Sequence, residues 1–456
     1  MLNVWRDTLH EIRDTRYAKM KPVNIGLLGM GTVGSGVINV LNRNAEEITR
    51  RAGREIRISH AAAKEYNAAA IQGLDRIGKI TQDAFAVVDD PEVQIVIELI
   101  GGYSPARELV LKAIHAGKHV VTANKALIAK YGNEIFDAAQ KKGVMVAFEA
   151  AVAGGIPIIK AIREGLAANR ILWVAGIING TSNFILTEMR EKGRSFGDVL
   201  KEAQTLGYAE ADPTFDVEGI DAAHKLTILG SIAFGMPLQF EKTYIEGITK
   251  IELQDVNYAG ALGYRIKLLG ITRKTEQGIE LRVHPTLIPA RRLIANVEGV
   301  MNAVVVKGDA VGPTLYYGAG AGSEPTASAV IADVVDVVRV LTTDPENRVP
   351  HLAFQPHHLS DISILPMAEV VTAYYLRLQA IDRPGVLADV TRILGDAGIS
   401  IEAILQKEPL EGAKHVPVII LTQRVQEKFM NQAIAQIEQL ESIQGPVMRI
   451  RMETLA

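Results

Sequence analysis

The sequence predicts an α/β fold, in which a doubly wound parallel sheet is followed by an α+β domain and a small βαββαβ unit. From residue 23, short apolar runs alternate with helical stretches, which is typical of a parallel sheet covered by helices. At 456 residues the chain is too long for one hydrophobic core, so several domains are expected. Beyond residue 372 the order is strand, helix, strand, strand, helix, strand.

The elements follow in order along the chain. The runs VNIGLL, IRISHAAA, VQIVIELIGG, GKHVVTANK and VMVAFEA are the expected strands of the first sheet. The runs NRILWVAGIINGTSNFIL, YIEGITKIEL, YRIKLLGITRK and IELRVHPTLIP predict strands mixed with helices, and the stretch TTDPENRVPHLAFQPHHLSDISILPMAEV has the weak periodicity of a linker. The expected division is an N-terminal extension (1–20), a dinucleotide-binding domain (21–150), a catalytic and dimerisation domain (151–343), a linker (344–372) and a C-terminal domain (373–452).

The composition narrows the class of protein. Hydrophobic residues make up 48% and charged residues 22%, and the net charge of −3 is spread without blocks, as in a soluble globular protein without a polyanion partner. The chain has no cysteine, which excludes disulfides, cysteine metal sites and thiol catalysis and makes a reducing cytoplasm the default compartment. The first twenty residues mix acids and bases and fit neither a signal nor a transit peptide. No apolar run has membrane-spanning length.

A glycine motif predicts the cofactor. Gly29, Gly31 and Gly34, with Thr32 and Val33 between them, form G-x-G-x-x-G directly after a strand and before a helix. The tight turn, the close approach of the backbone to a pyrophosphate and the dipole at the helix N-terminus need glycines at these places. In this context the motif predicts a Rossmann-type nicotinamide dinucleotide site.

The second strand indicates which dinucleotide is bound. It ends in HAAAKEY, without an acidic residue at its tip to hold a ribose 2′-hydroxyl, and Lys64 is near enough to meet a 2′-phosphate. NADP is therefore favoured. Glu65 follows directly, so NAD stays possible.

A helical stretch carries the candidate proton donor. In GIDAAHKLTILGSIAFG, Asp221 and Lys225 share one face with Ile228 and Ile232. A solvated ion pair at i, i+4 is the simplest interpretation. The pair continues an apolar stripe, however, and a desolvated lysine beside a carboxylate is typical of groups tuned for proton transfer. We therefore expect this pair to be catalytic.

Two further features surround this helix in sequence. Five carboxylates precede or begin it within twelve residues, namely Glu210, Asp212, Asp216, Glu218 and Asp221. Their spacing fits no calcium loop, and they suit a substrate that carries an ammonium group. Lys125 follows the buried run HVVTAN, which predicts a place at the carboxyl edge of the sheet, where cofactor and substrate meet, although it could merely begin a helix.

Several segments together resemble one enzyme family. GLLGMGTVGSGV, ELIGGYSPARELVLKAIHAGKHVVTANKALIA, FEAAVAGGIPIIK, NGTSNFILTEM, GYAEADPTFDVEGIDAAHK and YYGAGAGSEPTASAV resemble homoserine dehydrogenase over roughly residues 20–340. DRPGVLADVTRILGDAGISI resembles an ACT domain, as found in its monofunctional form. The resemblance implies reversible hydride transfer between NAD(P)H and L-aspartate 4-semialdehyde, giving L-homoserine in threonine, methionine and isoleucine biosynthesis.

The resemblance also implies residue roles. Lys225 would be the general acid/base, with Asp221 and Glu210 at the substrate's amino group and hydroxyl region and Asp216 in the same polar pocket. Lys125 would touch both cofactor and substrate. Gly207, Gly320 and Gly322 would approach the nicotinamide, and main-chain carbonyls of Glu149, Val152, Gly154 and Ile156 would bind a monovalent cation such as Na⁺.

The C-terminal unit is expected to sense an amino acid. Pro384 and Gly385, between Asp382 and Val386, make a turn into a helix whose free N–H groups can hold a carboxylate. The family resemblance points to L-threonine as the effector. The open edge of a small sheet also invites pairing between subunits, so a dimerisation module alone is the alternative, and a homodimer or homotetramer is expected.

The residues argue against two other functions. A phosphorylating semialdehyde dehydrogenase needs a cysteine for its thioester, and this chain has none. A non-catalytic regulatory protein that senses NADP and an amino acid would need no proton donor, so Lys225, Asp221, Glu210 and Lys125 argue against it.

Overall fold

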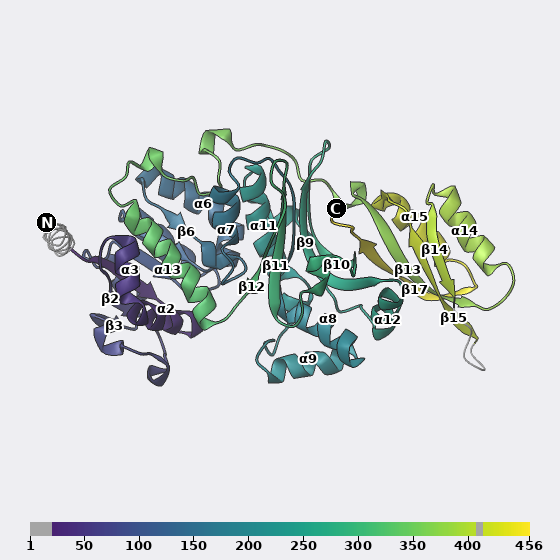
Figure 1. Ribbon diagram of the computed structural model, residues 1–456, viewed down its shortest axis with the longest axis horizontal. Helices are drawn as coiled ribbons and strands as arrows, with labels where there is room; N and C mark the ends of the chain where they lie inside the picture. The colour runs from purple at the N-terminus through teal and green to yellow at the C-terminus, as the bar shows by residue number, and fades with distance from the viewer. Residues whose placement is uncertain (1–20, 407–413) are drawn as a thin grey trace, which may run out of the picture. The chain divides into compact units, whose positions relative to one another are not determined.

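The computed structural model describes residues 21–406 and 414–456 (Figure 1). These residues form two compact units. The first contains residues 21–168, 231–239 and 318–360, and the second contains the described parts of 169–230, 240–317 and 361–456. Within the described residues, no helix is long and apolar enough to cross a bilayer.

The first unit is built on a parallel sheet with the strand order β3-β2-β1-β4-β5-β6. This is the doubly wound order of dinucleotide-binding domains, in which β1 pairs with β2 on one side and β4 on the other, so the prediction is confirmed. Its strands are β1 (Val23–Leu28), β2 (Ile56–Ala62), β3 (Lys79–Thr81), β4 (Ile95–Glu98), β5 (His119–Thr122) and β6 (Val146–Ala147). Strand β3 was not expected, because three residues carry no recognisable period.

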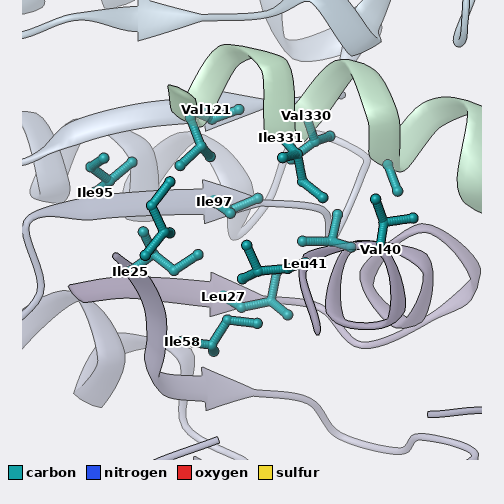
Figure 2. Close-up of a cluster of buried hydrophobic side chains, with 14 of the residues drawn as sticks. Ile25, Leu27, Val40, Leu41, Ile58, Ile95, Ile97, Val121, Val330 and Ile331 are labelled. Carbon is teal, nitrogen blue, oxygen red and sulfur yellow. The ribbon is translucent and has the colours of Figure 1, made fainter. Parts of the chain in front are cut away.

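Helices cover this sheet. They are α2 (Thr32–Arg43), α3 (Ala45–Ala52), α4 (Ala84–Asp89), α5 (Ala106–His115), α6 (Lys125–Lys142), α7 (Ile158–Lys160) and α13 (Ser323–Arg339). Figure 2 shows Val330 and Ile331 of α13 packing with Ile25, Leu27 and Ile97 of the sheet. The expected division assigned 318–343 to the second domain, whereas the apolar face of α13 is buried in the core of the first unit. Residues 151–168 and 231–239, which were also assigned to the second domain, fall in the first unit as well. The other expected boundaries stay predictions.

The stretch expected to be a linker contains only short 3₁₀ turns before β13 begins. Part of it is nevertheless packed within the first unit. The His351 ring stacks on Phe136 with centroids 4.9 Å apart. Phe354 covers Gly235, where an added Cβ would lie 2.6 Å from the phenyl ring. Low periodicity here reflects irregular backbone rather than a free chain.

The second unit is organised around an eleven-stranded sheet whose main path is β12-β11-β7-β9-β10-β17-β13-β15-β14. The long antiparallel pair β9–β10 lies at its middle. The strands are β7 (Ile171–Ile177), β8 (Tyr244–Ile245), β9 (Tyr264–Lys274), β10 (Ile279–Pro289), β11 (Met301–Gly308), β12 (Gly312–Ala319), β13 (Val371–Ile381), β14 (Ile401–Gln406), β15 (His415–Thr422), β16 (Val425–Gln426) and β17 (Ile443–Met452). Strands β11 and β12 were not predicted from the sequence.

The C-terminal part has the expected βαββαβ order, with β16 as a short addition. Helices α14 and α15 pack together over β13 and β15 around Tyr374, Val390 and Met430 (Figure 1). Strand β17 pairs with β13 and, in parallel, with β10, which joins the C-terminal strands to the rest of the sheet. The helices of this unit are α8 (Gly180–Lys192), α9 (Phe196–Thr205), α10 (Thr214–Val217), α12 (Leu253–Ala261), α14 (Val386–Asp396) and α15 (Glu427–Ile437). Helix α11 (Ile220–Phe234) begins in this unit, and its residues from 231 onward belong to the first unit.

Candidate active site

The glycine turn has the geometry that a bound pyrophosphate requires. Gly29 has φ +98°, and a Cβ there would lie 2.7 Å from the Leu99 carbonyl oxygen. A Cβ at Gly34 would lie 2.1 Å from the Gly29 carbonyl oxygen, so no other residue fits. Gly31 is exposed with open space around its Cα, and it caps α2 without a side-chain acceptor for the first N–H groups. Thr32 and Val33 begin that helix, so the residues present fit a dinucleotide phosphate.

The predicted glycines Gly320 and Gly322 lie beside this turn in the first unit. Directly after them, the Ser323 hydroxyl donates to the Thr32 carbonyl oxygen at 2.7 Å. A Cβ at Gly36 would lie 2.6 Å from the Ser323 carbonyl oxygen, so α2 and the start of α13 touch through backbone. Gly36 and Ser323 were not predicted as site residues, because their only local signal is a small residue in a helical pattern.

The carboxyl edge of the sheet is fixed by a buried carboxylate that was not predicted from the sequence. Glu98, at the end of β4, accepts hydrogen bonds from the N–H groups of Ile100 and Gly101 at 2.8 and 3.0 Å and from the Thr122 hydroxyl at 2.7 Å. Asn124 caps α6. Lys125 is the first residue of α6, so it lies at the sheet edge as expected and also begins the helix.

Lys64 lies two residues beyond β2 in a hollow of about 570 Å³, which Glu65, Tyr66, Thr81 and Gln82 also line. The side chain is exposed, and Lys64 is the one cation of that lining. The hollow is at the end of the second strand, where a dinucleotide presents its adenosine ribose. The position therefore suits the expected contact with a 2′-phosphate.

The loop after β6 contains the four residues expected to hold a cation. Val152, Gly154 and Ile156 are buried, and Gly154 has φ +46° and approaches the Gly320 carbonyl oxygen. The Glu149 carboxylate is hydrogen-bonded within the protein, because it accepts from the N–H groups of Ile159 and Lys160 at 2.9 and 2.8 Å.

Burial and the nearby Asp333 carboxylate raise the pKa of Glu149 to about 7. Within the described residues, no group of three or more acidic, histidine or cysteine side chains could hold a metal ion. In this loop the Glu149 carbonyl oxygen accepts from the Val152 N–H at 3.3 Å and the Ile156 carbonyl oxygen accepts from the Ile158 N–H at 2.7 Å, so the expected cation site stays a prediction.

In the second unit, Asp221 and Lys225 form a buried pair. The Lys225 Nζ donates to Asp221 Oδ2 and to the Ile178 carbonyl oxygen, at 2.7 Å each. The two side chains are only 6% and 11% exposed, so the interpretation as a solvated surface pair is wrong. Ile228 and Ile232 are buried on the same helix, as the spacing predicted.

Asn179 connects this pair to Asp216. Its Nδ2 donates to Asp216 Oδ1 at 2.7 Å and to Asp221 Oδ2 at 2.9 Å, while its Oδ1 accepts from the Ser182 N–H and caps α8. The Ser182 hydroxyl donates to the Asp216 carbonyl oxygen at 3.0 Å. Asp216, Asp221 and Lys225 are thus brought together as expected. The segment that contains Asn179 is part of the family resemblance, but no role was predicted for this residue.

The loop with Gly207 and Glu210 lies next to α8, because the Thr181 hydroxyl donates to the Tyr208 carbonyl oxygen at 2.6 Å. Gly207 and Glu210 are exposed. Within residues 21–406 and 414–456, the Glu210 carboxylate makes no hydrogen bond or ion pair, so its substrate contact stays a prediction. Asp212 accepts from the Thr214 N–H at 3.1 Å, and hydrogen bonds from the Thr214 side chain and N–H lower the pKa of Asp212.

The regulatory residues form the start of α14. Asp382, Pro384 and Gly385 are exposed, Gly385 has φ +97°, and Val386 is the first residue of the helix. No side chain caps this helix, so its first N–H groups are available in principle to a carboxylate. The Gln406 amide donates to Asp382 at 3.4 Å.

Comparisons with known proteins identify the family. Three family models match: the NAD-binding domain of homoserine dehydrogenase over residues 29–149, homoserine dehydrogenase over 157–335, and the ACT domain over 374–439. The homoserine dehydrogenase of Pseudomonas aeruginosa is 68% identical over 96% of this chain and 100% of that protein. That of Neisseria gonorrhoeae is 59% identical over the same shares. The chain belongs to the homoserine dehydrogenase family.

Solved structures agree with this assignment. A homoserine dehydrogenase from Thiobacillus denitrificans is 69% identical, covers 96% of this chain and 99% of its own, and superposes with a TM-score of 0.91. A hyperthermophilic archaeal homoserine dehydrogenase in complex with NADPH is 26% identical over 70% of this chain and 98% of its own, with a TM-score of 0.59. As a member of this family, the chain is an oxidoreductase with a nicotinamide-binding domain and an ACT domain.

Proposed function

We propose that Lys225 is the general acid/base in the reversible reduction of L-aspartate 4-semialdehyde to L-homoserine, with NADP as the preferred cofactor. The observation that carries this role is the buried Lys225–Asp221 pair, held at 2.7 Å on an apolar helix and fixed further by Asn179. Burying a lysine in this setting costs free energy of desolvation, whereas a surface ion pair stays hydrated. Neither of the two alternative functions requires a buried lysine–carboxylate pair.

In the oxidative direction, neutral Lys225 takes the hydroxyl proton of homoserine while the hydrogen on the same carbon leaves as hydride. In the reductive direction, the ammonium form of Lys225 returns that proton to the developing alkoxide and stabilises its charge. A bound nicotinamide ring supplies the acceptor and donor of hydride. Asp221, Asp216 and Glu210 would hold the substrate's ammonium group, and Lys125 would lie between substrate and cofactor.

The test is the absorbance of reduced nicotinamide after homoserine and each cofactor are added in turn. Reduction with homoserine, and oxidation with the semialdehyde, are expected. Glu210→Gln should raise the KM for homoserine and leave the Kd for the cofactor unchanged. Asp212→Asn is the matched control, because the Asp212 carboxylate is engaged with the Thr214 N–H. Unchanged kinetics in Glu210→Gln would remove Glu210 from substrate binding.

The preference for NADP rests on Lys64, the cation in the hollow beyond β2. A distant archaeal relative was solved with NADPH, which supports the same choice here. Lys64→Gln should lower kcat/KM for NADP more than for NAD. Equal loss with both cofactors would overturn the proposed contact.

The loop of Glu149, Val152, Gly154 and Ile156 would bind Na⁺ or a similar ion through carbonyl oxygens. Ala153 and Gly154 in this loop both have positive φ. Replacing Na⁺ by tetramethylammonium at constant ionic strength should lower turnover. Unchanged turnover would argue against the ion.

Two further expectations concern assembly and compartment. Strand β12 is an edge of the large sheet, and its Leu315 and Tyr317 side chains are exposed together with nearby Val311. Such an edge is suited to pairing with a second copy, so a homodimer or homotetramer is proposed. Sedimentation equilibrium tests this, and a monomer would contradict it. A chain without cysteine suits the cytoplasm, which we keep as the proposed compartment.

The ACT domain is proposed to bind L-threonine at the turn of Asp382, Pro384, Gly385 and Val386. The uncapped N-terminus of α14 would hold the threonine carboxylate, and Asp382 its ammonium group. Asp382→Asn in the full-length chain should weaken threonine inhibition. Inhibition that is unchanged in this variant would move the effector site elsewhere.

A further inference from the structure

A buried carboxylate lies under the loop that follows β4 in the first unit. Glu98, the last residue of β4, is fully buried. Its Oε1 accepts from the N–H groups of Ile100 and Gly101 at 2.8 and 3.0 Å, and its Oε2 accepts from the Thr122 hydroxyl at 2.7 Å. All three donors are uncharged, and in the described part of the chain no cation forms an ion pair with this carboxylate.

The hydrogen bonds around Glu98 have the pattern of an ionised carboxylate. Thr122 Oγ1 accepts from the Asn124 N–H at 3.0 Å, while its own proton is directed to Glu98. Each Glu98 oxygen therefore faces a donor, which is the arrangement that an acceptor-only group needs. The result is a negative charge that is held away from water and is compensated by hydrogen bonds alone.

The loop above this charge is open on its outer side. Gly101 and Gly102 have φ of +78° and +67°, and a Cβ added at either would meet no atom within 4 Å. The Asn124 amide nitrogen donates to the Gly102 carbonyl oxygen at 2.7 Å, which fastens the loop to the start of α6. A ligand can therefore approach the loop backbone directly, with Glu98 on the inner side.

The strand register places this loop in the nicotinamide half of the cofactor site. Leu28, Glu98 and Thr122 pair with one another at the ends of β1, β4 and β5. In this fold the pyrophosphate lies at the turn after β1 and the adenosine extends over β2, so the nicotinamide extends over β4 and β5. A Cβ at Gly29 would lie 2.7 Å from the Leu99 carbonyl oxygen, so the pyrophosphate turn and the loop above Glu98 touch through backbone.

The two redox forms of a nicotinamide cofactor differ in charge at this end of the molecule. The oxidised ring carries a positive charge, whereas the reduced ring is neutral. A buried anion therefore attracts one form and has little effect on the other. At an effective dielectric constant of about 20, unit charges about 10 Å apart attract each other by an amount that corresponds to roughly tenfold in a binding constant.

We propose that the Glu98 charge makes the oxidised nicotinamide cofactor bind more tightly, relative to the reduced one, than the same site would without that charge. Glu98 acts through the field of its carboxylate and through the loop that it positions. This binding preference requires only the nicotinamide-binding domain, and it holds for NADP and NAD alike.

A consequence for catalysis rests on the proposed function. Favouring the oxidised form favours the reductive direction, in which a C–H bond of the reduced ring breaks and its electron pair forms the new C–H bond at the aldehyde carbon. The carbonyl oxygen then takes the proton of Lys225. Glu98 would thus help to form homoserine without contact with the substrate.

The first experiment measures the Kd of the oxidised and of the reduced cofactor by titration calorimetry without substrate, using NADP or NAD, whichever binds the wild type more tightly. In Glu98→Gln, the introduced amide oxygen still accepts from the loop N–H groups, and its nitrogen donates to the Thr122 hydroxyl. The shape is kept and the charge is lost. The ratio of the oxidised Kd to the reduced Kd should rise about fivefold or more. An unchanged ratio would overturn the proposal, even if both constants rise.

Two control variants separate the charge from the hydrogen bonds. Thr122→Val keeps the charge and removes the hydroxyl, so both Kd values should rise together and their ratio should stay at the wild-type value. Glu108→Gln removes an exposed carboxylate of α5 in the same unit and should change neither constant. A ratio that rises as much in either control as in Glu98→Gln would refute a specific effect of the buried charge.

A second pair of variants tests the same effect from the surface and decides the question if Glu98→Gln does not fold. Ile100 is 40% exposed, so a substitution there leaves the core intact. Ile100→Glu adds a carboxylate to the loop, and Ile100→Gln is its uncharged match. The ratio of oxidised to reduced Kd should be about threefold lower in Ile100→Glu, with a larger difference at low salt. Equal ratios in the two variants would refute the proposal.

Failure of this proposal and failure of the proposed function give different results. A chain with the expected Kd ratios that does not reduce its cofactor with homoserine would count against the proposed function and leave the role of Glu98 supported. A chain that is active with homoserine, and whose Glu98→Gln variant keeps the wild-type ratio, would retain the proposed function and refute the role of Glu98.

Discussion

At the residue scale, the site in the second unit depends on how its charges are kept in place. One amide nitrogen of Asn179 donates to two carboxylates, Asp216 and Asp221, while Lys225 donates to the second of them. Two like charges near one another destabilise each other unless a donor or a cation lies between them. Asn179 and Lys225 supply both, so neither is replaceable by a residue that offers only an acceptor.

Replacing Lys225 by alanine should abolish turnover in both directions and leave cofactor binding nearly intact, because the glycine turn that holds the cofactor belongs to other residues. General acid/base catalysis contributes about 10²–10⁴-fold. Steady-state rates with homoserine, together with fluorescence titration of NADPH, measure the two effects. A variant that keeps more than about a tenth of the wild-type rate would exclude Lys225 from this role.

Asn179→Asp should separate the role of Asn179 in capping α8 from its role in positioning Asp216 and Asp221. An aspartate still accepts from the Ser182 N–H and caps α8, but it donates nothing and adds a third carboxylate. We expect the KM for homoserine to rise about tenfold or more. The rise of the oxidation rate with pH should also move to higher pH, because the added charge favours the ammonium form of Lys225.

The matched variant for this test is Asn179→Ser, which keeps the cap, loses the amide donor and adds no charge. It should raise KM without moving the pH profile. Two variants with wild-type pH profiles and equal KM values would show that Asn179 only caps the helix.

Sequence could predict part of this arrangement. Asp221 and Lys225 are four residues apart on an apolar helix, so their proximity follows from helical periodicity alone. Asn179 before a helical stretch indicates an N-cap, in which the side-chain oxygen accepts a backbone hydrogen bond. The pattern does not predict which groups the side-chain nitrogen contacts. Those contacts depend on α10 and α11, which are 37 and 42 residues further along at Asp216 and Asp221.

At the scale of elements, the edge strand β6 has an unusual support. It pairs with β5 on one side only. Two histidine rings accept hydrogen bonds from backbone N–H groups of β6 and of the residue just before it. His119 Nδ1 accepts from the Met145 N–H at 2.9 Å, and His351 Nε2 accepts from the Val146 N–H at 3.1 Å. A ring nitrogen can accept only while it is unprotonated. The loop with Glu149 follows this strand, so the rings also support the proposed cation site.

This support predicts that the first unit loses stability in acid. Burial lowers the pKa of His119 and of His351 from 6.5 to about 4. Between these values the unfolded chain binds more protons than the folded one, so stability is complete above about pH 6.5 and falls as the pH approaches 4. Each neutral ring contributes up to about 3 kcal/mol to the free energy of unfolding, and this contribution is lost as the pH falls toward 4. Calorimetric unfolding between pH 7.5 and 4.5 measures the loss.

His351→Gln provides the test of cause. Glutamine keeps an acceptor that does not titrate, so the unfolding temperature should depend less on pH, from a somewhat lower starting value. His357→Gln, at an exposed position in the same stretch, should behave as the wild type. The same dependence on pH in all three chains would mean that other groups are responsible.

Elements differed in how well the sequence predicted them. Long strands such as β9 and β10, and helices with an apolar face such as α11, were expected because their periods extend over many residues. Strand β12 alternates exposed and half-buried residues around glycines and a proline, so it lacks the apolar signal of a strand. The stretch before β13 is packed through His351 and Phe354, which no local pattern indicates.

At the scale of the whole molecule, the C-terminal part and the catalytic sheet are one structure within the second unit. Strand β17 pairs with β10, where Thr286 lies opposite Arg451. Asp255 of α12 binds Arg377 of β13 through two hydrogen bonds of 2.6 and 3.0 Å. The βαββαβ pattern was predictable from local sequence, but these pairings join residues more than 120 positions apart and had no local signal.

This continuity changes how regulation can be tested. A chain that ends near Glu369 would lose β17 and Arg377, and it would expose the edge of β10 and leave Asp255 without its cation. Loss of inhibition in such a chain would not separate an effector site from a damaged sheet. Variants of the full-length chain, such as Asp382→Asn, keep the sheet intact and are the sharper test.

Glu453, just after β17, should be one of the most stabilising single side chains in the second unit. Its Oε1 accepts from Arg282 at 2.5 Å and its Oε2 from Arg273 at 2.9 Å, and the Arg282 side chain is only 1% exposed. Glu453→Gln would leave buried Arg282 with less compensating charge. Breaking a buried pair of this kind costs about 3–5 kcal/mol, so the unfolding temperature of the second unit should fall by several degrees at pH 7.

The dependence on pH identifies the cause. Arg282 and Arg273 lower the pKa of Glu453 from 4.5 to about 2. The contribution of this carboxylate is therefore complete above about pH 4.5 and is lost as the pH falls toward 2, where the Glu453→Gln chain and the wild type should converge. Glu441→Gln, at an exposed position before β17, is the control and should match the wild type at every pH. A stability difference between Glu453→Gln and wild type that stays constant down to pH 2 would show that packing, rather than the charge of Glu453, holds β17 against β10.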